Sequence, residues 1–338
     1  MVRYFLIFSF LSVFFTSFEA QSSNRMIFLE AQTVGGYSSK ESEPVYYSNN
    51  RNDAMQKPSL GFDYIEKLSN DYQDLATIAI QGRLAYDKSY NKWEPQLYNA
   101  YVEAKTSVGG DLWLGSNRPA FLLGSYWDTH AELLQPLSME GFGFGRDWGV
   151  GYTKYLDDGD FKASMTSGSG QSFRTEGNYL AALRYGKGVI NFDNYNVGLS
   201  LANGRTLKTM GYHVEDHKPK DFRMIGFDGS YNFNNVEQKA EFAFGEKQDK
   251  ASLGVLYRLT LKFLEDDKLK LDFQPSYTKN HKDYDKTLSF GTTYKVSSET
   301  AVRFMYSYSE AKETMLGMTD KSSDNVILGQ IYYYFRWK

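Results

Sequence analysis

The sequence predicts an all-β fold, a transmembrane antiparallel β-barrel of about sixteen strands, with about fourteen as the smaller possibility. Three features indicate it: alternating apolar and polar residues in many short segments, connections that alternate between short and long, and an apolar N-terminal segment. Aromatic residues make up 17% of the 338 residues, yet the mean hydropathy is -0.52. Continuous apolar helical spans would raise that value, whereas alternation along strands averages it out.

The last segment, residues 324–337, has an apolar or aromatic residue at every second position from Ile327 on. This stripe consists of Ile327, Gly329, Ile331, Tyr333, Phe335 and Trp337. Side chains of a strand alternate between its faces, so one face is apolar while the other becomes polar towards its end. Such a strand suits a barrel that presents one face to lipid and the other to a lumen. The alternative is an amphipathic edge strand of a soluble β protein.

The most regular alternation lies in residues 250–264. Positions 251 to 263 place Ala, Leu, Val, Tyr and Phe side chains on one face, and the opposite face is polar except for Leu256. Similar patterns predict sixteen strands, at residues 26–35, 59–68, 74–87, 92–107, 110–117, 143–156, 159–168, 177–186, 189–203, 222–233, 236–247, 250–264, 268–280, 284–296, 299–311 and 324–337.

The connections between these strands differ in length in a regular way. Every second connection is a short turn rich in Asn, Asp, Gly and Ser, as in Asn234-Asn235. The long connections are 36–58, 118–142, 169–176, 204–221 and 312–323. Membrane barrels have short turns at one rim and longer loops at the other. An even number of strands then places both termini at the short-turn rim.

Residues 1–20 have the features of a cleavable signal peptide. Arg3 provides the positive charge, Tyr4 to Phe15 form the apolar region, and cleavage is expected between Ala20 and Gln21. An uncleaved membrane anchor is the alternative, although the apolar run is short for a span. We therefore expect residues 21–338 to form a single transmembrane β-barrel domain.

The closing strand resembles the last strand of bacterial outer-membrane barrels, which ends on an aromatic residue, usually at the final position. Here Trp337 is followed by Lys338. The strand number and the apolar third outer loop, residues 118–142, resemble the sixteen-stranded general porins, in which that loop folds into the lumen and narrows the pore. Residues 97–105 and 112–121 are weakly similar to the phosphate-selective porin group, but the chain lacks a ladder of Arg, so that substrate is not carried over.

The third outer loop is apolar for a solvated segment. Its large apolar residues are Phe121, Leu122, Leu123, Tyr126, Trp127, Leu133, Leu134 and Leu137. Such a set requires burial, and the inner wall of a barrel can provide it. We expect the loop to fold inward; the alternatives are that it caps the barrel from outside or covers a neighbouring subunit.

An inward loop would direct its polar side chains into the pore. These loop candidates are Arg118, Asp128, His130, Glu132 and Glu140, and the facing wall offers Arg83, Lys105, Arg258, Lys262 and Arg303. Acidic groups on the loop opposite basic groups on the wall create a transverse field, which orients polar solutes and sets ion preference. We predict a pore constriction at these residues.

Other kinds of site have little support in the sequence. His213 and His217 in the predicted loop 204–221 are weak metal candidates, and we expect no metal and no cofactor. Ser125, Asp128 and His130 are close in sequence, but loop neighbours do not define a catalytic geometry, so we expect no enzyme. The chain has no Cys, and a net charge of -3 gives no electrostatic reason to bind nucleic acid.

The sequence therefore predicts an outer-membrane channel for passive diffusion of small hydrophilic solutes or ions. Its expected partners are the lipid bilayer and the solutes, and the resemblance to porins implies a homo-oligomer, a trimer. The alternatives are a non-conducting barrel that serves adhesion or encloses a periplasmic electron carrier, and a barrel lipase or protease.

Overall fold

The computed structural model describes residues 22–46, 56–71, 73–87, 91–127, 132–189, 193–315 and 318–337; the predicted signal peptide, residues 1–20, lies outside them. The elements are β1 (Ser22–Ser38), β2 (Glu43–Val45), β3 (Ser59–Ser69), β4 (Asp74–Asp87), β5 (Lys92–Lys105), β6 (Asp111–Asn117), η1 (Gly124–Tyr126), η2 (Leu137–Glu140), β7 (Asp147–Leu156), β8 (Gly159–Thr166), β9 (Tyr179–Lys187), β10 (Tyr195–Met210), β11 (His213–Phe233), β12 (Val236–Lys247), β13 (Lys250–Phe263), η3 (Glu265–Asp267), β14 (Leu269–Asn280), β15 (Asp283–Lys295), β16 (Thr300–Met315) and β17 (Met318–Trp337). None of the helices in these ranges is long and apolar enough to cross a bilayer.

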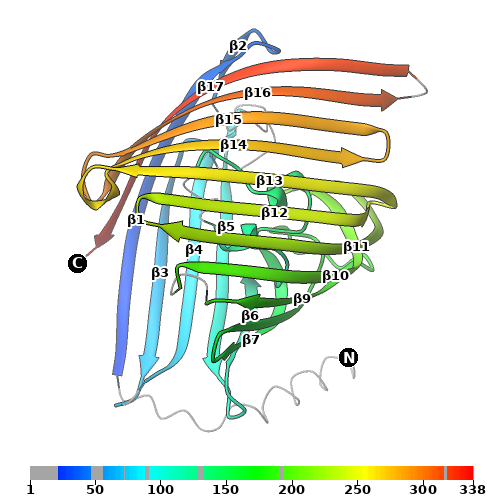
Figure 1. Ribbon diagram of the computed structural model, residues 1–338. Helices are drawn as coiled ribbons and strands as arrows, with labels where there is room; N and C mark the ends of the chain where they lie inside the picture. Colours follow the sequence, from blue (N-terminus) through cyan, green and yellow to red (C-terminus); the bar gives the residue numbers. More distant parts are fainter. Residues whose placement is uncertain are drawn as a thin grey trace.

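Sixteen of the seventeen strands close into an antiparallel barrel. Figure 1 shows the strands arranged around a common interior. β1 pairs with β17 on one side and with β3 on the other, so each strand of the ring has two neighbours. The extra strand, β2, pairs with the end of β1 beyond the part that contacts β3. Closure matters because lipid offers no hydrogen bonds to an open sheet edge.

The predicted strands are confirmed. Each of the sixteen segments overlaps a strand of the ring, and β4 and β12 have the predicted bounds, whereas the strand predicted at 189–203 is β10, Tyr195–Met210. Ile27 pairs with Trp337, and Ser22 pairs with Ser69 beside a short turn. The start of the first strand and the end of the last strand therefore both lie at the short-turn rim.

Two of the predicted long loops, 204–221 and 312–323, are wrong. β10 and β11 continue as a hairpin to Met210 and His213, and β16 and β17 continue to Met315 and Met318. In these extensions the backbone ladder persists, but polar residues occupy both faces, so the alternation that marks a membrane strand is missing. The three-residue β2 was not predicted either.

The two faces of β17 have the predicted character where the strand belongs to the predicted segment 324–337. On β17, Ile327, Ile331 and Trp337 are 43%, 53% and 59% exposed on the outside, whereas Leu328 and Gln330 are buried on the inside. Near the short-turn rim the outer face carries a band of exposed aromatic side chains, namely Tyr185, Tyr195, Tyr231, Phe233, Phe263, Tyr294 and Trp337. Such a band is typical of a barrel at the membrane interface.

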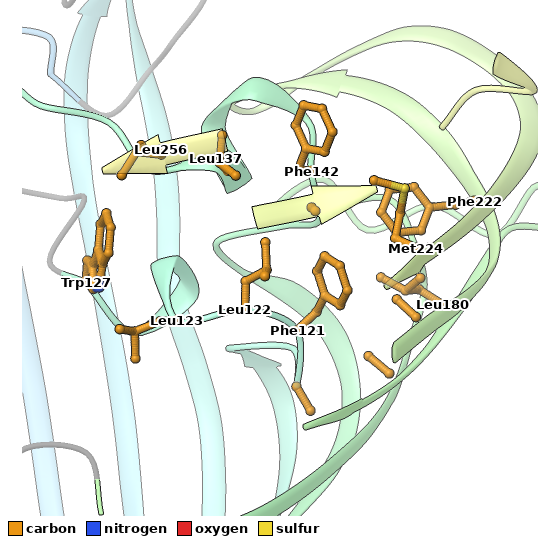
Figure 2. Packing of buried hydrophobic residues seen from close by; sticks show 14 residues of the cluster. Phe121, Leu122, Leu123, Trp127, Leu137, Phe142, Leu180, Phe222, Met224 and Leu256 are labelled. Carbon is orange, nitrogen blue, oxygen red and sulfur yellow. The ribbon is translucent and has the colours of Figure 1, made fainter. Parts of the chain in front are cut away.

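The connection between β6 and β7, residues 118–146, folds into the barrel. It contains η1 and η2, and Figure 2 shows its apolar side chains directed towards the inner wall. The predicted inward loop is confirmed.

Candidate functional site

The inward loop is held by polar side chains that point inward from the wall strands. The Leu122 amide donates to Ser200 Oγ on β10 (3.1 Å), and the Ala120 amide donates to Ser164 Oγ on β8 (2.9 Å). From β14, Gln274 Nε2 donates to the carbonyl oxygen of Gln135 (2.9 Å). These bonds replace the water that a surface loop would have, because a buried backbone needs partners for its polar groups.

Glu241 on β12 holds two separate parts of the loop. Its carboxylate accepts hydrogen bonds from the amide of Gly124, in η1, and from the amide of Leu137, in η2 (3.1 Å for Leu137). The side chain is buried, with the residue 1% exposed. One wall residue therefore fixes the positions of both helical turns.

An apolar cluster attaches the loop to the wall formed by β9 to β13 (Figure 2). The loop residues are Ala120, Phe121, Leu122, Leu123, Trp127, Leu137 and Phe142, and the wall residues are Leu180, Ala182, Ala202, Phe222, Met224, Ala243 and Leu256. Leu256, the exception in the alternation of β13, thus has a structural reason to be apolar. Gly226 gives room to the loop, because a Cβ there would lie 2.5 Å from Leu122 Cδ2.

The loop also contacts the opposite part of the barrel. Leu133 and Leu134 are buried in a second cluster with Val34 of β1, Val45 of β2, Met305 of β16, and Val326 and Leu328 of β17. The first cluster lies on β9 to β13, so the loop crosses the lumen from one wall to another. The unpredicted β2 contributes directly to this second contact.

A cavity of about 380 Å³ remains beside the loop, between residues 132–134 and the wall strands β12 to β17. Its charged lining residues are Glu132, Glu237, Lys239, Arg258, Lys270, Asp272, Lys295, Glu299 and Arg303. On the other side of Leu134 lies a void of only about 10 Å³, which is lined by Gln135, Glu140 and Met305 among others. Leu134 therefore borders both spaces.

Arg258 is the main contact between the charged wall and the loop. Its Nη1 lies 2.6 Å from Glu132 Oε2, and its Nη2 donates to the carbonyl oxygen of Leu134 (2.9 Å). The guanidinium also stacks over the Trp127 ring, with 4.8 Å from Cζ to the ring centroid. Burial opposes the charge of Glu132, but Arg258 and nearby cations outweigh it, so the pKa of Glu132 is held below its usual value.

Of the predicted constriction residues, Glu132, Arg258 and Arg303 line the same cavity. Arg303 Nη1 donates to Gln330 Oε1 (3.1 Å), and its guanidinium lies over the Tyr332 ring. Asp128 and His130 lie outside the described residues.

The other predicted constriction residues in the described ranges do not line that cavity, although Lys262 contacts one of its lining residues. Arg83 is buried at the wall, 3.6 Å from Glu30 of β1, and Lys262 lies 3.2 Å from Glu237. Arg118 stacks over Tyr126, and Glu140 lines the small void on the other side of Leu134.

Lys105, at the end of β5, is exposed at the short-turn rim. Asn99 of β5 pairs with Gln81, which is buried on the lumen face. Lys105 is on the same face of β5 as Asn99, so it also lies on the lumen face.

Sequence reasoning missed several lining residues. Lys239, Lys270, Asp272 and Lys295 line the cavity from β12, β14 and β15. Lys270 and Asp272 alternate with outward Leu271, so strand parity could have identified them. Strand parity also places Glu241 on the inward face, but its role in holding the loop is visible only once the position of the loop in the barrel is known.

A network of buried charged side chains lies on the inner side of one part of the barrel wall. Arg184 of β9 lies 3.2 Å from Asp160 and 2.6 Å from Asp228, and it also donates to Asn196 Oδ1. The Arg184 and Asp228 side chains are fully buried. The ions are paired and hydrogen-bonded, as burial of charge requires.

The weak metal and catalytic candidates are not brought together. His213 and His217 lie on β11 and not in a loop, and they contact different acids, Glu94 and Glu176. Ser125 Oγ lies 3.4 Å from each of the carbonyl oxygens of Pro119 and Leu122. The other two residues considered as catalytic candidates, Asp128 and His130, are not among the described residues.

Solved structures of outer-membrane proteins share this fold. The anion-selective porin of Comamonas acidovorans aligns over 93% of this chain and 100% of its own, with a TM-score of 0.66 and 12% identity. OmpF of Salmonella typhi, in complex with daunomycin, aligns over 94% of this chain and 98% of its own, with a TM-score of 0.65 and 14% identity. OmpT, an outer membrane protein of Vibrio cholerae, aligns over 94% and 100%, with a TM-score of 0.62 and 14% identity.

No protein-family model matches the chain, and no curated protein matches its sequence. The structural matches define the class of fold: the chain has the closed barrel of the sixteen-stranded general porins.

Proposed function

We propose that this protein is an outer-membrane channel through which small hydrophilic solutes or ions diffuse passively. The observation that carries the proposal is the charged cavity of about 380 Å³ that remains inside the closed barrel beside the inward loop. Barrels of about sixteen strands are wide enough to hold an aqueous lumen. Charged groups on both sides of the cavity keep it hydrated.

We further propose that the constriction lies between the loop and β13 to β17, with Glu132 on the loop and Arg258 and Arg303 on the wall. This arrangement supports the transverse field, because the acid belongs to the loop and the two bases belong to the wall. Among the other lining charges, Lys239 and Glu237 lie 2.6 Å apart, so these two are paired along the wall itself.

Conductance in planar lipid bilayers tests the proposal. Addition of the purified protein, without a tag, should give stepwise current increments of uniform size. The reversal potential in a salt gradient then reports whether anions or cations pass preferentially. A barrel that inserts, as judged by its heat-modifiable mobility on a gel, but gives no current would contradict the channel function.

A non-conducting barrel is the second candidate, and one observation favours it. The described part of the loop contacts two different walls, so it crosses the lumen. If the loop plugs the barrel, the intact protein should not conduct, whereas a variant without residues 120–138 should. That pattern would favour an adhesion or scaffold role.

Three further expectations belong to the channel proposal. The mature protein should begin at Gln21, which N-terminal sequencing of the exported chain tests. It should assemble as a trimer in the outer membrane, which cross-linking and native mass spectrometry test. It should have no lipase or protease activity, and we propose no catalytic role for Ser125.

A further inference from the structure

Three metal-ligating side chains meet at the long-loop rim, separate from the lumen cavity. Asp87 ends β4, Glu94 lies on β5, and His213 begins β11. Their donor atoms all lie within 4.8 Å of one another. In the barrel order, β5 and β11 are separated by β6 to β10, so the cluster connects two hairpins that are not neighbours in the wall.

The β10–β11 hairpin reaches this place because it extends beyond both of its neighbours. β10 loses its pairing with β9 after Arg205, and β11 gains its pairing with β12 only at Phe222. Between these points the two strands pair only with each other, up to Met210 and His213. Near the end of the hairpin, Ser172 Oγ donates to the Tyr212 carbonyl, which helps to hold it over the shorter strands below.

We propose that Asp87, Glu94 and His213 bind a divalent transition-metal cation such as Zn²⁺, which links the β10–β11 hairpin to the β4–β5 hairpin. One imidazole nitrogen with two carboxylate oxygens is a donor set that suits Zn²⁺, whereas Ca²⁺ and Mg²⁺ prefer oxygen donors alone. Three protein donors leave a further position for water. The proposal does not depend on whether the barrel conducts.

The orientation of the side chains supports this assignment. Nε2 of His213 lies 3.5 Å from Oε2 of Glu94, so the imidazole nitrogen faces the carboxylates. Asp87 is only 3% exposed, and the Glu94 side chain is 14% exposed, so the donors are partly shielded from solvent. Shielding strengthens the attraction between a dication and the two carboxylates.

Two lysines compete with a cation at this place. Lys57 Nζ contacts Asp87 Oδ2, and Lys92 Nζ lies 2.9 Å from Glu94 Oε1. Each lysine uses one carboxylate oxygen, and each carboxylate has a second one. Lys57→Met should therefore increase Zn²⁺ affinity by several-fold, because it removes a repelling charge and leaves the three donors in place. A purely structural ion-pair cluster would not respond in this way.

The matched control is His217, four residues further along the same strand. It is exposed and lies 2.7 Å from Glu176, so it represents an ordinary surface histidine. The test is isothermal titration of the tag-free, detergent-solubilised full-length barrel with ZnCl₂. We expect one strong site, an affinity lower by about tenfold or more in His213→Ala, and no change in His217→Ala.

Equal Zn²⁺ binding by the wild-type protein and His213→Ala would overturn the site, and so would an equal loss in His217→Ala. Binding of CaCl₂ as strong as that of ZnCl₂ would also overturn the proposed donor chemistry. Heat-modifiable gel mobility checks that each variant still forms the barrel.

A separate experiment tests the geometry without metal. The chain has no native Cys, so Glu94→Cys/His213→Cys introduces the only thiol pair. A bifunctional thiol cross-linker as long as the two replaced side chains should join the two hairpins, and proteolysis between them should then fail to separate the fragments. Absence of the cross-link in a folded barrel would remove the basis of the site.

Discussion

At the scale of single residues, charged wall side chains position the loop through its backbone. Glu241 accepts from the amides of Gly124 and Leu137, and Arg258 donates to the carbonyl oxygen of Leu134. A buried amide left without its acceptor costs about 1–3 kcal/mol. Glu241 and Arg258 therefore stabilise the docked position of the loop by satisfying its buried backbone groups.

Substitution of Glu241 should release the loop. Glu241→Ala leaves two buried amides without their acceptor, a cost of about 2–6 kcal/mol for the docked position. We expect faster cleavage of the loop by proteases and larger, noisier conductance steps. The control is Glu246→Ala on the same strand, where the side chain is 36% exposed and lies 3.7 Å from Arg223. Loop cleavage at the wild-type rate in Glu241→Ala would contradict the docking role.

Substitution of Arg258 should change ion preference. Arg258→Gln removes a wall cation from the cavity and leaves Glu132 without its 2.6 Å partner. The reversal potential should shift towards cation selectivity, with a permeability ratio changed by about twofold to tenfold, which corresponds to at most about 1.4 kcal/mol. Arg223→Gln, whose side chain is 61% exposed at the long-loop rim, is the control. A shift of equal size in both variants would show that Arg258 has no special place in the permeation path.

At the scale of elements, the loop and the strands have different sources of stability. Each strand of the ring is held by two backbone ladders, whereas the loop is held by two apolar clusters and a few side-chain bonds. The loop is therefore the part that can be removed while the barrel remains closed.

Deletion of residues 120–138 should raise single-channel conductance several-fold, because it removes the segment that crosses the lumen. The inward apolar residues of the wall, such as Phe222 and Leu328, then face water, so some loss of thermal stability is expected as well. Single-channel recording measures the first effect, and gel mobility after stepwise heating measures the second. Conductance equal to that of the intact protein would contradict the constriction.

Element prediction from the sequence succeeded where one face meets lipid and failed where both faces are solvated. β4 and β12 were predicted with their observed bounds, but the free end of the β10–β11 hairpin was assigned to a loop. Beyond the membrane, both faces of a strand meet water, so pairing leaves no apolar stripe in the sequence. For the same reason the sequence placed His213 in a loop.

At the scale of the whole molecule, stability depends on closure between the first and last strands. β1 and β17 pair over twelve residues, from Ile27 with Trp337 to Ser38 with Val326. Removal of β17 would expose the edges of β1 and β16 to lipid, where unpaired backbone groups cost several kcal/mol each.

Truncation after residue 317 should therefore prevent stable insertion. We expect the shortened chain to lose heat-modifiable gel mobility and resistance to proteases, whereas the single change Trp337→Ala at the rim should keep both. Liposome flotation of the refolded proteins measures insertion. A truncated chain that floats and resists proteases as well as the full chain would show that closure by β17 is not required.

The sequence alone predicted the barrel, about sixteen strands with fourteen as the smaller possibility, the rim that holds both termini and a third outer loop that requires burial. The barrel properties follow from local alternation, because lipid and water impose opposite demands on the two faces of a membrane strand, whereas the burial of the loop follows from its apolar side chains. Only the tertiary structure decided which charges share a cavity, since Glu132 and Arg258 are separated by 126 positions in the chain. It also decided why Leu256 and Leu328 are apolar on a lumen face, because their partners belong to a loop whose docking no strand period encodes.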